Sequence, residues 1–262
     1  MTARISRHAT VVVVVVWAVC AFAQAQEQVS ARTWVGREAE LEAFLKSAKT
    51  TKVEEIGTGV TKPKRVTLEA GGPVAMMAWK PIRPGRYNGY FESYRNEIAA
   101  YELDKYFGLG MVPPTVERQL NGEMGAAVLW ASPTKSFKDL GGVPGQTNVK
   151  GPPAAMVAPW TRQITKAKMF DNLIANIDPN LGNWLVDPQW NLILIDHTRA
   201  FTTTRDLYHK LIAVDPELWN KMKALDEAAL TTAIGAWVDK GAIKAILERR
   251  DRMQDVIDKL TR

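Results

Sequence analysis

The sequence predicts an α+β fold with two lobes, in which a small antiparallel β lobe with one key helix precedes a mainly helical lobe. Two observations carry this prediction. Between residues 53 and 131, short strand-like runs separated by glycines surround a single helical stretch. Beyond residue 158, apolar residues recur at helical spacing, interrupted by one hairpin. We expect residues 26–131 to form the first lobe and residues 132–262 the second.

Residues 1–25 have the pattern of a secretory signal peptide, which the mature protein lacks. Arg4 and Arg7 give a basic start, an apolar run follows, and the small residues Ala23–Ala25 (AQA) suit cleavage. The alternative is a membrane anchor, but the run is shorter than the roughly 20 residues that a spanning helix needs. We therefore expect export, cleavage near Ala25, a periplasmic or secreted protein, and no membrane span in the mature chain.

Composition narrows the chemistry that the protein can perform. The only cysteine, Cys20, lies in the leader, and Val19 is too large for the position before a lipid-modified cysteine. The mature protein then has no thiol, and His197 and His209 are too few for a histidine-rich zinc site or a Ser–His–Asp triad. Without the leader, which carries Arg4 and Arg7 and no acidic residue, the formal net charge falls from +6 to +4. This mild positive charge suits anionic ligands but is weak support for nucleic acid, which we do not expect as a partner.

The first lobe is predicted to begin with a helix over residues 36–49, followed by three antiparallel strands with glycines at their connections. Residues 91–110 (FESYRNEIAAYELDKYFGLG) predict one helix, with Gly108 as its stop signal. Two further strands, MVPPTVERQL and EMGAAVLWA, are joined by an Asn-Gly dipeptide that favours a tight hairpin.

The second lobe is predicted to begin with a mobile connection over residues 132–158, rich in Pro, Gly, Ser and Lys and holding a short helical piece. Residues 161–177 then have the apolar spacing of a helix. A hairpin follows this helix, with the strands WLVD (184–187) and LILID (192–196) joined by the turn PQWN (188–191). From about Asp215 the chain predicts three short helices, broken near Asp226 and Gly241.

Lys80 and Glu97 are the first candidate site residues. Lys80 ends an apolar strand, where a point charge is unfavourable unless it meets an anion. At 100° per residue, an apolar stripe runs through Phe91, Tyr94 and later residues of the predicted helix, and Glu97 lies at its edge, facing the sheet. Protein kinases orient the phosphates of ATP with such a lysine and glutamate. A strand-end lysine that reaches water is the alternative.

The second group of candidates surrounds the predicted hairpin. Asp178 precedes Asn183 by five residues, the spacing of a kinase catalytic loop, and Asp196 ends the apolar run of the second hairpin strand. Phosphoryl transfer needs a carboxylate near the acceptor hydroxyl and oxygen ligands for Mg²⁺ or Mn²⁺. Each residue has a structural alternative: Asp178 and Asn183 could shape or cap a turn, and Asp196 could be the N-cap of a following helix.

Two stretches resemble the atypical protein-kinase-like superfamily. They are residues 79–118 (WKPIRPGRYNGYFESYRNEIAAYELDKYFGLGMVPPTVER) and residues 169–201 (MFDNLIANIDPNLGNWLVDPQWNLILIDHTRAF). Within this superfamily the sequence is most similar to the secretory-pathway protein and sugar kinases, including the Golgi casein kinase. The HipA kinases and the phosphoinositide 3-/4-kinases are more distant relatives. The resemblance implies a two-lobed protein-kinase-like fold.

The resemblance also implies roles for individual residues. Lys80 would contact the phosphates of ATP, and Glu97 would orient Lys80 or help to hold the metal ion. Asp178 would be the catalytic base, and Asn183 and Asp196 would bind Mg²⁺ or Mn²⁺. The turn that holds Gly57 and Gly59 (IGTG) would cover the phosphates.

The activity implied is transfer of a phosphoryl group from ATP or another nucleotide to a protein, sugar or lipid hydroxyl. Pro179 and Asn180 stand where these families carry Arg-His or a histidine two residues after the aspartate. Two alternatives therefore stay open. One is a nucleotide-binding pseudokinase that acts through partners, and the other is an AMPylating relative.

Overall fold

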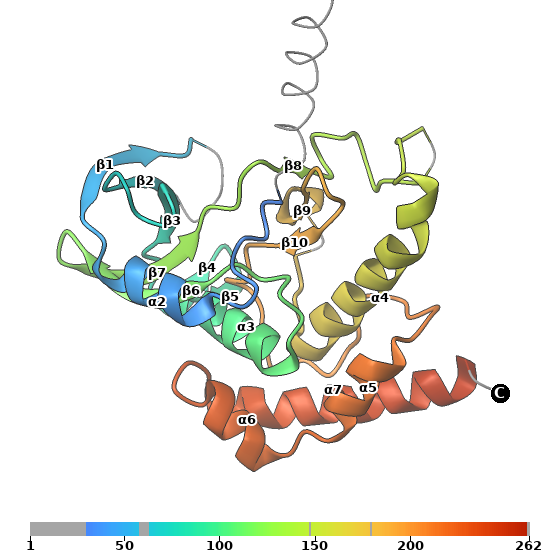
Figure 1. The fold of residues 1–262 in the computed structure, drawn as a ribbon. Helices are drawn as coiled ribbons and strands as arrows, with labels where there is room; N and C mark the ends of the chain where they lie inside the picture. The colour runs from blue at the N-terminus through green and yellow to red at the C-terminus, as the bar shows by residue number, and fades with distance from the viewer. Residues whose placement is uncertain (1–29, 58–62, 147, 179, 261–262) are drawn as a thin grey trace, which may run out of the picture.

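The computed structural model describes residues 30–57, 63–146, 148–178 and 180–260 (Figure 1). The predicted leader and Gly59 lie outside the described residues. The architecture is the predicted α+β fold, with a lobe built on an antiparallel sheet and a mainly helical lobe beside it. The positions of the lobe boundaries stay predictions.

The first lobe is built on a five-stranded sheet of order β1-β2-β3-β7-β6, in which every neighbouring pair is antiparallel. Its strands are β1 (Thr50–Glu55), β2 (Lys64–Leu68), β3 (Met76–Lys80), β6 (Thr115–Leu120) and β7 (Glu123–Leu129). Helix α2 (Glu38–Ser47) packs on β6 and β7, with Leu41 and Leu45 buried in the same apolar cluster as Met77 and Trp79. The predicted strands and the first helix are therefore confirmed.

The prediction that the second helix starts at Phe91 was wrong. A short hairpin precedes it, made by β4 (Gly85–Tyr87) and β5 (Tyr90–Glu92), because Asn88 and Gly89 adopt the positive φ angles of a tight turn (50° and 87°). Helix α3 (Tyr94–Phe107) starts after its N-cap Ser93, whose hydroxyl accepts the N–H of Arg95 at 3.0 Å.

Helix α3 ends as predicted at Gly108, which has the left-handed φ of 66°. The helix contacts β6 and β7 in the first lobe and α6 in the second. It therefore lies between the two lobes (Figure 1).

The second lobe contains a strand that the sequence did not predict. Within the connection over residues 132–158, β8 (Lys135–Ser136) pairs with β9 (Trp184–Val186), which pairs in turn with β10 (Leu192–Leu194). Phe137 follows β8, is fully buried, and contacts the rings of Trp160 and Trp184. This single aromatic side chain ties the connection to the core, which a composition rich in Pro and Gly does not reveal.

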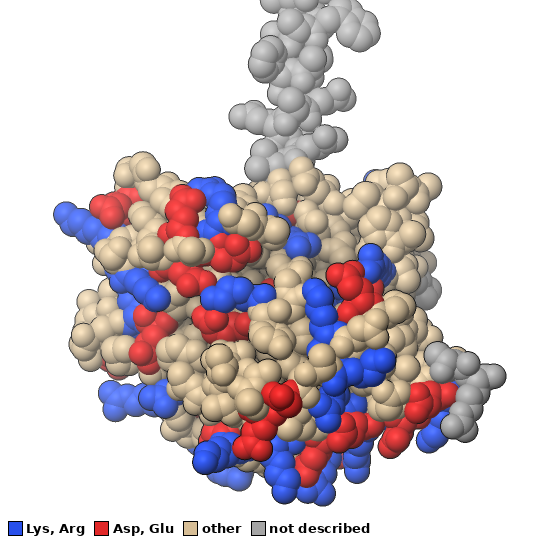
Figure 2. Space-filling view, turned by 60° about the horizontal axis from the view of Figure 1, so that its bottom comes forward, with Lys and Arg blue, Asp and Glu red and all other residues tan. Residues whose placement is uncertain are grey.

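The remaining elements of this lobe are mainly helical. They are η2 (Ala154–Met156), α4 (Val157–Ile174), η3 (Leu181–Asn183), α5 (Pro216–Lys223), α6 (Glu227–Ile234) and α7 (Lys240–Leu260). The three predicted helices are present as α5, α6 and α7, and the breaks near Asp226 and Gly241 are confirmed, because α6 starts just after Asp226 and α7 starts at Lys240. The last helix is long, not short. No described helix has the length and the apolar character that crossing a bilayer requires. Figure 2 shows acidic and basic side chains interspersed on one face of the molecule.

Arg249 of α7 is fully buried and holds three segments of this lobe together. Its guanidinium donates to the carbonyl of Leu173, near the end of α4, at 2.9 Å. It also donates to the carbonyls of Thr202 and Thr204 at 2.9 and 2.6 Å. Burial lowers its pKa to about 10, which keeps the side chain charged near neutral pH. The chain after β10 is thus fixed to the helix that leads to Asp178.

We expect Arg249→Met to lower the free energy of unfolding by about 2–4 kcal/mol, because it leaves buried carbonyls without donors. Urea unfolding measures this change. The control is Arg252→Met, three residues along the same helix, where the arginine is half exposed and, among the described residues, pairs only with the exposed Asp206. Equal stability of the two variants would contradict this account of Arg249.

Candidate active site

Lys80 lies at the centre of the candidate site and joins three separate segments of the chain. Its ammonium is 2.5 Å from Oε1 of Glu97 on α3 and 3.0 Å from Oδ1 of Asp196, just beyond β10. The side chains of Lys80 and Glu97 are 9% and 2% exposed, so this pair is removed from water, whereas Asp196 remains 33% exposed. The structure therefore brings together three of the predicted site residues.

The charges of these residues stabilise one another. Burial alone would lower the pKa of Lys80, but the carboxylates of Asp196 and Glu97 outweigh burial and raise it above its ordinary value. Burial alone would raise the pKa of Asp196, but the neighbouring ammonium of Lys80 lowers it overall. Lys80 is thus cationic and Asp196 anionic near neutral pH. Asp196 keeps an open side where its charge can meet a cation.

The backbone changes direction at Asp196, just after β10, because this residue adopts an unusual conformation. Its φ of 64° lies in the left-handed region, which Asp tolerates better than most residues. Just before it, the N–H of Ile195 donates to the carbonyl of Asn183 at 3.0 Å. The N-cap alternative for Asp196 was wrong, because the next described helix is α5, which has its own N-cap, Asp215.

Asn183 ends η3 and is 6% exposed. Its side-chain nitrogen is buried and has no hydrogen-bond partner among the described residues. The turn-capping bond in this loop comes from Asn180, whose side chain accepts the N–H of Gly182 at 2.9 Å. Asn183 therefore has an unsatisfied polar side chain next to the segment that leads to Asp196.

Asp178 is the predicted residue that stands apart. Its Oδ1 accepts the N–H of Asn180 at 3.1 Å, which is the expected turn interaction. Its Oδ2 lies 3.7 Å from Nη1 of Arg199. Among the described residues, no hydrogen bond or ion pair joins Asp178 to Lys80, Asn183 or Asp196. The carboxylate is 22% exposed and accessible to a bound molecule.

Arg199 and Glu92 are site residues that the sequence reasoning missed. Nε and Nη2 of Arg199 both lie within 3.0 Å of Oε1 of Glu92, which is fully buried, and the guanidinium lies 4.6 Å from the ring centre of Tyr90. Nη1 remains directed to Asp178. No spacing rule relates a residue of the hairpin β4–β5 to a residue beyond β10, so the pair could be found only in three dimensions.

His197 is another buried polar residue that the sequence reasoning did not place here. It is fully buried beside Glu97, with Nδ1 3.9 Å from Oε2, and its ring meets the ring of Phe170 edge-on. Burial lowers its pKa, so the imidazole is neutral near neutral pH.

The start of α3 is fastened to the segment after Asp196. The side-chain amide of Asn96 donates to the carbonyls of Thr198 and Ala200 at 2.8 and 2.9 Å. The N–H of Ser93 also donates to the carbonyl of Thr198, at 3.0 Å. Because α3 carries Glu97, these bonds fix the distance between Glu97 and Asp196.

The predicted phosphate-covering turn is described only in part. Gly57 follows β1 with a φ of 64°, a conformation that favours glycine, and it lies in open space. Its role as a phosphate contact, together with that of Gly59, stays a prediction. Within the described part of the chain, no group of three or more His, Cys, Asp or Glu side chains is arranged to hold a metal ion.

We expect Lys80→Met to lower the free energy of unfolding by about 3–5 kcal/mol, because it leaves the buried carboxylate of Glu97 unpaired. Adding Glu97→Gln should recover part of the loss, since no charge then remains buried at that position. The control is Lys105→Met, which removes a partly exposed lysine of α3 that also has two carboxylate partners, Glu42 and Glu102. Additive effects of Lys80→Met and Glu97→Gln in urea unfolding would contradict this coupling.

Comparison of the sequence with protein-family models and with curated proteins gives no match. Solved structures do match the fold. The Golgi casein kinase with Mn/ADP bound has a TM-score of 0.58 and 14% identity over 85% of this chain and 75% of that one. A hydra Fam20 protein solved with sugar has a TM-score of 0.63 and 17% identity over 85% and 88% of the two chains. The Helicobacter pylori proinflammatory kinase CtkA has a TM-score of 0.50 and 11% identity over 82% and 95%. The chain therefore has the protein-kinase-like fold of these atypical kinases.

Proposed function

We propose that the protein is a phosphotransferase that moves a phosphoryl group from ATP, or another nucleotide, to a hydroxyl group. The observation that carries the proposal is the buried Lys80, held between Glu97 and Asp196. A charge triad of this kind, in which Lys80 and Glu97 are buried, adds little net stability to a fold, so a functional role explains it better. The fold shared with the Golgi casein kinase and the hydra Fam20 protein supports the same conclusion.

Lys80, with Glu97 behind it, would bind the phosphates of the nucleotide, and Gly57 and Gly59 would cover them. Asn183 and Asp196 would hold a Mg²⁺ or Mn²⁺ ion, Asn183 through its side-chain amide oxygen and Asp196 through its ionised, partly open carboxylate. Such an ion would neutralise negative charge on the phosphates. The neighbouring Golgi casein kinase was solved with Mn/ADP, which agrees with this ligand pair.

Asp178 would act as the base. In the proposed step, the acceptor oxygen forms a bond to the γ-phosphorus while the bond to the bridging oxygen breaks and the nucleoside diphosphate leaves. The acceptor proton passes to Asp178, whose carboxylate is accessible and is held by Asn180 and Arg199. The proposed acceptor is a protein, sugar or lipid hydroxyl; the hydra Fam20 protein, a neighbour of this fold, was solved with sugar.

A second candidate function is a nucleotide-binding pseudokinase that acts through partners. The observation that favours it is the bond from the N–H of Asn180 to Asp178, since this interaction alone explains an aspartate in a turn. In both cases we propose an exported protein, on the basis of the leader pattern in residues 1–25.

Asp178→Asn separates the two functions, because it keeps the size and the turn bond of the side chain but removes the base. If Asp178 is the base, phosphoryl transfer should fall about 10²–10⁴-fold while the affinity for ATP with metal stays the same. Intact-mass detection of phosphate on the acceptor, or on the protein itself, measures transfer, and calorimetry measures ATP binding.

The matched control is Asp226→Asn, at the N-cap of α6, where asparagine is an equally good cap. Undiminished transfer by Asp178→Asn would remove this residue from the mechanism. A wild-type protein that binds ATP but transfers nothing, neither phosphate nor AMP, would favour the pseudokinase.

Arg199 would act as a positioning residue for Asp178. Lysine cannot bind Glu92 through two nitrogens and face Asp178 with a third, so Arg199→Lys should lower kcat about 10- to 100-fold and leave ATP affinity unchanged. Arg95→Lys, an exposed change at the start of α3, is the control. In the double variant with Asp178→Asn, the arginine change should have almost no further effect, because it acts through the aspartate. Multiplicative losses would show that Arg199 acts in another way.

A further inference from the structure

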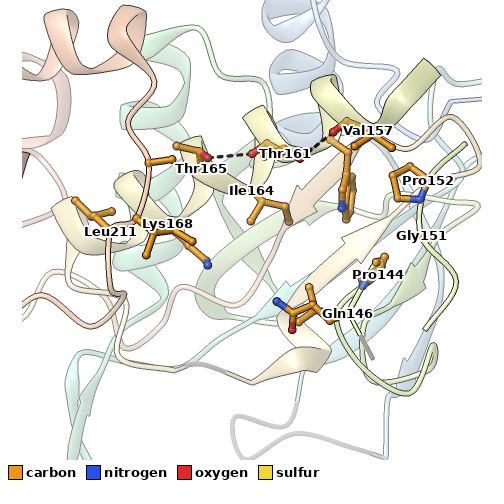
Figure 3. A pocket seen from close by; sticks show the side chains of 15 residues that line it. Pro144, Gln146, Gly151, Pro152, Val157, Thr161, Ile164, Thr165, Lys168 and Leu211 are labelled. Carbon is orange, nitrogen blue, oxygen red and sulfur yellow. Dashed lines mark hydrogen bonds between the residues drawn. The ribbon is translucent and has the colours of Figure 1, made fainter. Parts of the chain in front are cut away.

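The helical lobe has a second hollow that the proposed reaction does not use (Figure 3). Its volume is about 400 Å³, within the range of small-molecule sites. Three segments form its walls: residues 143–146 with 151–152, residues 157–168 of α4, and residues 211–213. None of the proposed site residues lines it.

The walls of this hollow are mostly apolar. Trp160 and Leu211 are buried, and Pro144, Pro152 and Ile164 add further apolar surface. Ile212, on the rim, is 71% exposed, the most exposed of the large apolar side chains in the described chain. Such a surface gains free energy when an apolar molecule covers it.

The hollow offers a bound molecule one positive charge and few other hydrogen-bond donors. The hydroxyls of Thr161 and Thr165 donate to carbonyls one helical turn earlier, at 2.9 and 3.0 Å, so their protons are used. Lys168 is half-buried, and its side chain is directed into the hollow (Figure 3). The side-chain amide of Gln146 faces it from the opposite wall.

Lys168 differs from the other basic residues of α4. Arg162 and Lys166 lie within 4.0 Å of Asp215 and Glu217, so their charges are compensated. Lys168 makes no hydrogen bond or ion pair with any residue in the described ranges. A half-buried cation without a counter-ion, next to an apolar wall, is complementary to an anion that carries an apolar body.

We propose that this hollow binds an amphipathic monocarboxylate, with its carboxylate on Lys168 and its hydrocarbon chain against Trp160 and Ile212. Nucleotides and other strongly hydrated polyanions do not fit, because a single cation faces apolar walls. A neighbouring hollow of about 370 Å³ shares Ile212 and Ala213 and continues the apolar surface past Trp219 and Leu260. The surface therefore has room for a chain of medium length. A fatty acid is the simplest molecule of this class.

Calorimetry with decanoate, below its micelle concentration, tests the proposal on the wild-type protein. We expect saturable binding of one decanoate, and binding of decan-1-ol that is at least tenfold weaker, because the alcohol lacks the charge that Lys168 compensates. Lys168→Met should weaken decanoate about tenfold and leave the alcohol unchanged. Lys166→Met, which removes a lysine of the same helix that already has acidic partners, is the control and should bind decanoate as the wild type does.

Ile212→Ser tests the apolar contact separately and removes only an exposed side chain, so the fold should persist. It should weaken decanoate several-fold and octanoate less, because the longer chain reaches the rim. Equal binding of decanoate and decan-1-ol, equal effects of Lys168→Met and Lys166→Met, or no decanoate binding at about 1 mM would each overturn the proposal. A finding that the wild-type protein transfers no phosphoryl group would leave this proposal unaffected, since none of these binding measurements uses that activity.

Discussion

The charge of Lys80 in a buried position is the constraint on which the arrangement of the candidate site depends. An ammonium removed from water is strongly unfavourable unless carboxylates surround it. Here the two carboxylates come from different elements, Glu97 from α3 and Asp196 from the turn after β10. Lys80 can therefore be buried only when the sheet, helix α3 and the hairpin β9–β10 are packed together. Its charge thus favours one tertiary arrangement of these three elements.

Other polar groups, which are not themselves charged partners of Lys80, hold the site residues in place. The carbonyl of Asn183 fixes the end of β10 through Ile195, and a left-handed backbone turns Asp196 toward the lysine. On the other side of the site, Arg199 joins the fully buried Glu92 to the neighbourhood of Asp178. The donor side and the acceptor side of the proposed reaction are thus built on the same short segment, residues 196–200.

Much of the fold was predictable because local signals agreed with tertiary structure. The sheet strands, the stop of α3 at Gly108 and the hairpin before Asp196 follow from periodicity and turn residues. Errors arose where a tertiary contact decides the outcome. Phe137 anchors β8 through two tryptophans, and the hairpin turn at Asn88 takes Phe91 out of the helix. The contact between Lys80 and Glu97 was foreseeable from the faces of a strand and a helix, whereas the pair Arg199–Glu92 joins residues 107 apart with no shared pattern.

The bonds of Asn96 have a consequence for regulation. Many switchable enzymes alternate between two populated states by moving an element that carries a site residue, and the free-energy gap between the states must then be small. Moving α3 outward here would leave the carbonyls of Thr198 and Ala200 and a buried amide without partners, each at about 1–3 kcal/mol. The outward state would be scarcely populated. For the proposed phosphotransferase, these bonds therefore argue against control by an outward movement of α3 and favour control through the supply of ligands.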